Sequence, residues 1–190
     1  MEKDKTQEAD TFNALIAEIK AGGDTAFEKF YETYKQYIFS VVRTFHHWSV
    51  TSEEILNTAL VKIWEFSKNP KPIENPYGWL HTVVSNASKD LLPKRITYTL
   101  EEDSVAVDDT MEAFISQDTY EYMIRKLSLK EREILSKKLL AECTFNEIAR
   151  ELKRPIASVT AIYYRALKKV QMDLEKDKKQ DVEKILQNFF

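Results

Sequence analysis

Basic side chains gather near the end of this 190-residue chain, which as a whole carries a net charge of -3. Residues 144–169 hold only two anions, Glu147 and Glu151, beside six cations: Arg150, Lys153, Arg154, Arg165, Lys168 and Lys169. Lysine and arginine bind nucleic acids mainly by neutralising phosphates. The segment is therefore a candidate DNA-binding site, although six cations are also typical of a solvated helix face. The acidic balance of the whole chain argues against strong DNA binding without a partner.

The same segment has the spacing of a helix-turn-helix. Thr144 and Glu147 form a capping box that predicts a short helix, Lys153-Arg154-Pro155 predicts a tight turn, and the apolar positions from Val159 to Leu174 predict a longer helix. Lys153 stands where such turns usually have glycine. We expect it to adopt positive φ at a cost of about 1 kcal/mol.

No residue pattern predicts catalysis, a metal site or a cofactor. Cys143 is the single cysteine, the three histidines lack metal-ligand spacing, and no glycine-rich loop is present. His81 has no evident nucleophile beside it, and we interpret it as a structural or DNA-facing histidine. The chain is not expected to be an enzyme.

The elements that position these residues are predicted to be helices. With 3 Gly and 5 Pro, the composition favours an all-α fold, and capping boxes at Thr51/Glu54 and Ser128/Glu131 mark two more helix starts. Asn75 before Pro76 marks another. The apolar stripe that contains Trp79 makes that residue a core residue rather than a base-stacking platform.

An acidic segment without Lys or Arg, residues 101–121, predicts a linker between two small domains. The expected division is an N-terminal four-helix bundle at 10–95, a linker at 96–120, a helix-turn-helix domain at 121–175 and a charged tail at 176–190. No run of residues is long and apolar enough for a membrane span, and no signal peptide is recognisable at the start, so we expect a cytoplasmic protein.

Taken together, the motifs resemble the extracytoplasmic-function (ECF) sigma factors of bacterial RNA polymerase, which belong to the sigma-70 family. The resemblance covers about residues 12–172. In the first domain it rests on Asp24-Thr25-Ala26-Phe27, Tyr31, Tyr34, the segment from Ser52 to Trp64, Trp79-Leu80, Asn86, Asp90 and Lys94-Arg95. In the second it rests on Leu129 to Leu135, Glu147-Ile148-Ala149, Val159 and Arg165-Ala166.

The resemblance implies a transcription-initiation function and three binding surfaces. The N-terminal bundle at 10–95 would be sigma region 2. It would dock on the β′ clamp of the polymerase through Glu53, Glu54, Asn57, Leu60 and Val61. It would contact the minus-ten promoter element through Asn75, Asn86, Lys89, Lys94 and Arg95. Region 4 would contact the minus-thirty-five element through Arg154, Ser158, Thr160, Ala161, Arg165 and Lys168. The implied partners are core polymerase, through its β′ clamp and β flap, and promoter DNA, and an anti-sigma factor is a further candidate.

The chain departs from the family pattern in its last helix. Thr160, Ala161 and Ile162 stand where many members have Lys, Ser and Arg, so base readout is either weak or based on apolar contacts with thymine methyl groups. Two alternatives to a sigma factor remain open: a stand-alone helix-turn-helix regulator, and a helical protein that sequesters a partner without promoter activity.

Overall fold

The structure is a computed structural model that describes residues 2–23, 25–45, 50–91, 124 and 126–187. The described residues are almost entirely helical, which confirms the predicted all-α fold. The predicted linker at 96–120 lies outside them, as do Lys94 and Arg95 of the predicted minus-ten surface. Among the described residues, no helix is long and apolar enough to cross a membrane.

Four helices form the N-terminal bundle: α1 (Glu2–Lys20), α2 (Ala26–Phe45), α3 (Ser52–Lys68) and α4 (Pro76–Leu91). Their apolar stripes meet in one core that is rich in aromatic rings. Phe12 of α1 lies at its centre, with ring centroids 5.5 Å from Phe30 and 5.6 Å from Trp79. Trp79 also packs on Phe66 at 4.6 Å, so it is a core residue, as the apolar stripe predicts.

The predicted helix starts are confirmed by their side-chain hydrogen bonds. All three capping boxes are formed, at Thr51/Glu54, Ser128/Glu131 and Thr144/Glu147. At the start of α4, the Asn75 Oδ1 atom accepts a hydrogen bond from the Gly78 backbone N–H at 2.8 Å. Each of these contacts satisfies a backbone donor that the first helical turn leaves unpaired.

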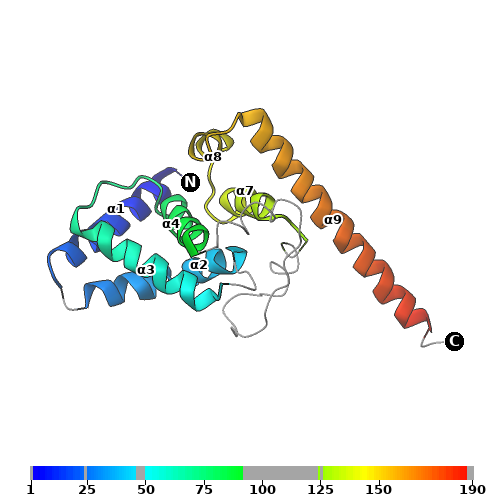
Figure 1. Ribbon diagram of the computed structural model, residues 1–190, viewed down its shortest axis with the longest axis horizontal. Coiled ribbons are helices and arrows are strands. Elements are labelled where there is room, and N and C mark those ends of the chain that lie inside the picture. The colour runs from blue at the N-terminus through cyan, green and yellow to red at the C-terminus, as the bar shows by residue number, and fades with distance from the viewer. Residues whose placement is uncertain (1, 24, 46–49, 92–123, 125, 188–190) are drawn as a thin grey trace.

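Within the described residues, three helices form the C-terminal part: α7 (Leu129–Leu139), α8 (Phe145–Glu151) and α9 (Ile156–Gln187). Their core joins α7 to both partners through Ile134, Ile148 and Val159. The helix of α9 continues through Gln187, so much of the predicted tail at 176–190 is helical. Figure 1 shows α9 projecting away from the other helices toward the C-terminus.

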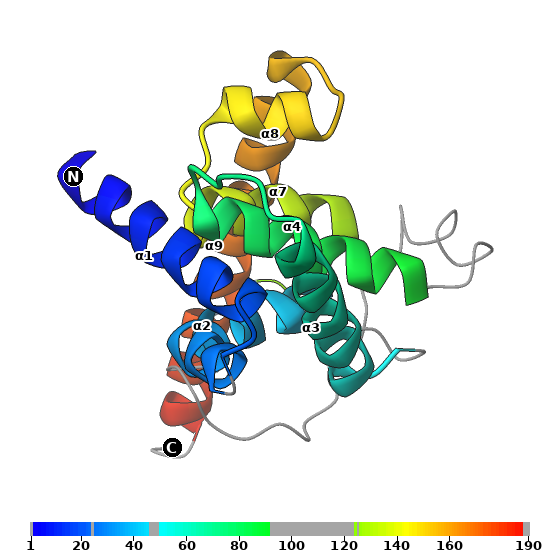
Figure 2. The ribbon, with the colours of Figure 1, turned by 90° about the vertical axis from the view of Figure 1, so that its left-hand side faces the viewer.

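The two parts of the chain pack directly against each other, with α7 lying against α2 and α4 (Figure 2). Leu129 and Leu140, at the ends of α7, contact the core of the bundle. Tyr37 and Tyr77 contact both cores, and the Tyr37 hydroxyl donates to the Tyr77 carbonyl oxygen at 2.8 Å. The junction is therefore part apolar and part polar.

Candidate nucleic-acid interface

The predicted helix-turn-helix is formed by α8, a tight turn and α9. Lys153 has φ = 50°, which confirms the expected left-handed conformation at the position where glycine is usual. The turn closes through the Arg154 backbone N–H, which donates to the Ala149 carbonyl oxygen at 2.9 Å. A non-glycine residue in this conformation stores about 1 kcal/mol of strain.

The turn is the most basic part of this surface. A hollow of about 610 Å³ lies between α8 and α9, and Arg150, Lys153 and Arg154 line it together with Asn146 and the first residues of α9. All three cations are exposed. Exposed cations around an open hollow suit the binding of a DNA phosphate.

The side chains predicted to contact the minus-thirty-five element lie on the first four turns of α9 or just before it. Arg154, Ala161, Arg165 and Lys168 are exposed, whereas Ser158 and Thr160 are half-buried. Sequence reasoning missed Tyr164, which is 62% exposed, and Ile156, which is 48% exposed. The sequence did contain a signal for these two residues: Ile156, Thr160 and Tyr164 are each four residues apart, so they share one face of the helix with the predicted contact residue Thr160.

Lys169, the last cation of the basic segment, pairs with a residue of α7: its ammonium lies 2.8 Å from Glu131 Oε1. Burial disfavours the ionised form of Glu131, but hydrogen bonds from Lys169 and Ser128 outweigh it and lower the pKa of this carboxyl below its ordinary value of 4.5. Lys169 therefore holds α9 against the start of α7.

The predicted polymerase-docking residues lie along α3. Glu53, Asn57 and Val61 are exposed and Leu60 is half-buried. Glu54 is exposed, but its carboxylate accepts hydrogen bonds from the Thr51 backbone and hydroxyl, so it also serves the helix start. Trp64, which sequence reasoning did not place in this surface, is 47% exposed beside Val61 at 56%. We call Asn57, Leu60, Val61 and Trp64 the α3 stripe.

Of the described residues predicted to contact the minus-ten element, Asn75 and Lys89 have partners within the fold. Asn75 caps α4 through its oxygen, and its amide nitrogen lies 3.8 Å from Cys143 Sγ. Asn86 and Lys89 are exposed on α4. Lys89, however, points to α7, where its ammonium donates to Glu133 Oε1 at 2.6 Å.

A cluster of polar side chains joins α4 to α7 and α8, and no sequence pattern predicts it. Lys137 is fully buried, and its ammonium donates to both carboxylate oxygens of Glu151 at 2.8 Å and to the Thr82 hydroxyl at 3.1 Å. Ser85 donates to Glu133 at 3.0 Å. We call these residues the polar junction.

His81 belongs to this junction and does not face DNA. It is fully buried, and Nε2 lies 2.7 Å from Ser136 Oγ. Burial, together with the positive charges of Lys137 and Lys89, lowers the pKa of His81 well below its ordinary value of 6.5. The structural interpretation is correct, and the DNA-facing alternative is wrong.

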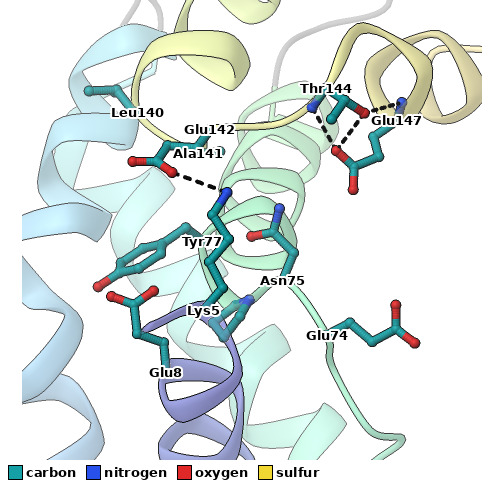
Figure 3. Close-up of a pocket in the computed structure, with 11 residues that line it drawn as sticks. Lys5, Glu8, Glu74, Asn75, Tyr77, Leu140, Ala141, Glu142, Thr144 and Glu147 are labelled. Carbon is teal, nitrogen blue, oxygen red and sulfur yellow. Dashed lines mark hydrogen bonds and ion pairs between the residues drawn. The ribbon is translucent and has the colours of Figure 1, made fainter. Parts of the chain in front are cut away.

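A second cavity of about 610 Å³ lies where α1 meets the segment between α7 and α8. Figure 3 shows Lys5 reaching Glu142 across this cavity, at 3.1 Å, and the Thr144–Glu147 capping box at its rim. The Lys5–Glu142 ion pair and the capping box thus serve the packing of the chain and the start of α8.

Comparison with known proteins agrees with this geometry. The family model for sigma-70 region 4 matches residues 117–170, the segment that contains α7, α8 and most of the predicted recognition surface. We call this matched segment region 4. No curated protein sequence matches the chain.

The fold of the whole chain is similar to that of CnrH, solved in complex with the cytosolic domain of CnrY. The TM-score is 0.57 at 18% sequence identity, over 86% of this chain and 97% of CnrH. At this level of identity the similarity concerns the fold alone; together with the region 4 match it agrees with the resemblance to the ECF sigma factors described in the sequence analysis.

Proposed function

We propose that this protein is a sigma factor that directs bacterial core RNA polymerase to specific promoters and assists strand opening at the minus-ten element. In this proposal the α3 stripe docks on the β′ clamp, α4 contacts the minus-ten element and the start of α9 enters the minus-thirty-five element. The β flap of core polymerase would contact region 4. We expect the protein to act in the cytoplasm, where its polymerase is.

The observation that supports this proposal is the separation of two exposed surfaces of different chemistry. The α3 stripe is apolar, with Val61 and Trp64 about half exposed, as is typical of protein contacts. The turn between α8 and α9 is cationic, as is typical of phosphate contacts. A protein that links a polymerase to DNA needs both.

The charge distribution favours action within a complex. The chain has a net charge of -3, so its basic turn lies in an overall repulsive field for DNA. Core polymerase would then supply most of the affinity for DNA, and the sigma factor would determine the promoter position at which the complex binds. A stand-alone regulator would instead need tight duplex binding of its own.

Lys89 ties this function to the packing of the two parts. Its ammonium pairs with Glu133 of α7, so contact with a promoter phosphate requires it to exchange a carboxylate for a phosphate. CnrH, which has a similar fold, is solved in complex with the cytosolic domain of CnrY, and we propose an anti-sigma factor as a further candidate partner of this chain.

The experiment that tests the proposal is run-off transcription by purified core polymerase, with and without the full chain, on a library of promoter fragments. Specific initiation that depends on the chain would support it. If core polymerase binds the chain and initiates nowhere, the chain is a sequestering protein. If core polymerase does not bind it, the chain is a stand-alone regulator.

A further inference from the structure

The first three turns of α9 present an apolar surface where a recognition helix usually presents polar side chains. Its members lie within nine residues of one another and are exposed except for the half-buried Thr160, and we call them the apolar face: Ile156, Ala157, Thr160, Ala161 and Tyr164. Ile156 and Tyr164 are 48% and 62% exposed. Residues three and four apart share one side of a helix, so the five side chains form a continuous patch.

Thr160 belongs to this face through its methyl group. Its hydroxyl donates within the helix, to the carbonyl oxygens of Ile156 at 3.1 Å and Ala157 at 3.0 Å. That proton is therefore not available for a base edge. The γ-methyl group is what Thr160 offers to a neighbouring molecule.

Tyr164 is held in place by other aromatic rings although it is exposed. Its ring centroid lies 5.4 Å from Tyr163 and 6.5 Å from Phe145 of α8. Phe145 is in turn covered by the Lys138 ammonium at 5.2 Å. A fixed ring loses little conformational entropy on binding, which makes it an effective contact residue.

Cations flank the apolar face and indicate what covers it. Lys153 and Arg154 precede it in the turn, and Arg165 and Lys168 follow it on the same helix, all of them exposed. An apolar patch between phosphate-binding cations fits a DNA groove better than a lipid or an apolar protein surface. In the major groove, the C5-methyl group of thymine is the apolar group that distinguishes one base pair from the others.

We propose that the apolar face reads thymine C5-methyl groups in the duplex element that region 4 binds. This inference rests on the proposed function only in taking that duplex to be the minus-thirty-five element of a promoter. Ile156 and Tyr164 become specificity residues beside Thr160 and Ala161. The preferred element contains thymines opposite the first turns of α9, and their recognition depends on methyl groups rather than on hydrogen-bond donors from this face.

The test begins with selection of bound sequences from randomised duplexes, by the full chain alone at low salt and by its complex with core polymerase. Each thymine of the selected element is then replaced by deoxyuridine, which removes the methyl group and keeps the base pairing. Binding is expected to fall about three- to five-fold for each methyl group in contact, the effect of one buried methyl group.

Protein variants separate methyl contacts from an effect of the substitution on DNA shape. Thr160→Ser removes one methyl group and keeps the hydroxyl, and Tyr164→Ala removes the ring; each should reduce the thymine-over-deoxyuridine preference at one position. Tyr164→Phe should keep it. Met172→Ala, at a 48% exposed residue two turns further along α9, is the matched control and should leave every preference unchanged.

Three results would overturn the inference: selection of no sequence by either sample, a selected element without thymine, or equal binding of thymine and deoxyuridine duplexes by the wild type. If the chain directs initiation at a promoter equally well after thymine is replaced by deoxyuridine in its element, the inference is overturned and the proposed function is supported. Methyl-dependent binding by the chain alone, with no binding to core polymerase, would support it while the proposed function fails.

Discussion

The His81 Nε2 atom lies 2.7 Å from Ser136 Oγ, and this buried hydrogen bond joins α4 of the bundle to α7 of region 4. The Ser136 hydroxyl itself donates to the Glu133 carbonyl oxygen at 3.2 Å, so we assign the imidazole proton to Nε2. The ring is then neutral, in agreement with its lowered pKa. A neutral histidine between two lysines makes the junction sensitive to acid.

Acidification should destabilise the protein through His81. The unfolded chain binds a proton near the ordinary pKa of 6.5, whereas the folded chain resists it, so stability falls as pH drops below about 6.5. The loss reaches at most about 1.4 kcal/mol per pH unit from this one group. Thermal unfolding of the wild type and of His81→Gln between pH 7.5 and 5.5 measures it.

The glutamine variant should show a flatter dependence in that range, because its amide does not titrate. The glutamates with lowered pKa values, Glu54, Glu131 and Glu147, act in a separate range. They lose their contribution only as pH falls through 4.5 and below. Parallel curves for the wild type and His81→Gln above pH 5.5 would contradict the assignment.

Removing the partner of the buried Lys137 should destabilise the junction. Glu151→Gln leaves the Lys137 ammonium buried without a carboxylate, at a cost of about 3 kcal/mol. This is the lower end of the usual range, because the Glu151 side chain retains 35% exposure. Chemical denaturation of the full chain measures the change in the free energy of unfolding.

The double variant Lys137→Met/Glu151→Gln is the informative control. It replaces the buried charge with an apolar side chain of similar length, so most of the lost stability should return. A double variant as unstable as the sum of the two single variants would show that the pair is not the source of the effect.

Glycine at the helix-turn-helix turn should raise stability and weaken DNA binding. Lys153→Gly relieves the strain at φ = 50°, worth about 1 kcal/mol, and also removes a cation of the basic hollow. The melting temperature should therefore rise. For DNA binding by the polymerase complex, the slope of log affinity against log salt concentration should decrease by about one, the effect of one lost phosphate contact.

Glu142→Gly is the matched control for that variant. Glu142 has φ = 49° at the end of α7, and its ion pair with Lys5 is exposed and contributes little. This variant should also raise the melting temperature, but with unchanged salt dependence of DNA binding. Equal effects of the two variants on DNA binding would remove Lys153 from the DNA interface.

A charge in the α3 stripe should weaken binding to core polymerase. Leu60→Glu tests this surface, but Leu60 is half-buried, so the variant also perturbs the bundle. Val61→Glu and Trp64→Ala change side chains that are about half exposed and should each raise the dissociation constant at least about ten-fold. Titration of labelled protein with core polymerase measures this.

Thr11→Glu is the control, because it places the same charge at an exposed residue of α1, outside the α3 stripe and region 4. It should leave the affinity for core polymerase close to that of the wild type. Normal affinity of both Val61→Glu and Trp64→Ala would exclude the α3 stripe from the polymerase interface.

The sequence by itself determined the elements and their starts. The capping boxes at Thr51, Ser128 and Thr144, the Asn75 cap and the positive φ of Lys153 all depend on residues a few positions apart. Local hydrogen bonds and backbone sterics settle such features, so short sequence windows contain them. The motif order likewise indicated the family.

The tertiary structure alone decided which polar residues face the junction and which face solvent. Lys137 and Lys138 are neighbours in one charged helix, yet Lys137 is fully buried against Glu151. Lys89, predicted to contact DNA, pairs with Glu133, and His81 bonds Ser136 across the same junction. These pairs join residues 14 to 55 positions apart, and only the packing of α7 and α8 against the bundle brings them within hydrogen-bonding distance.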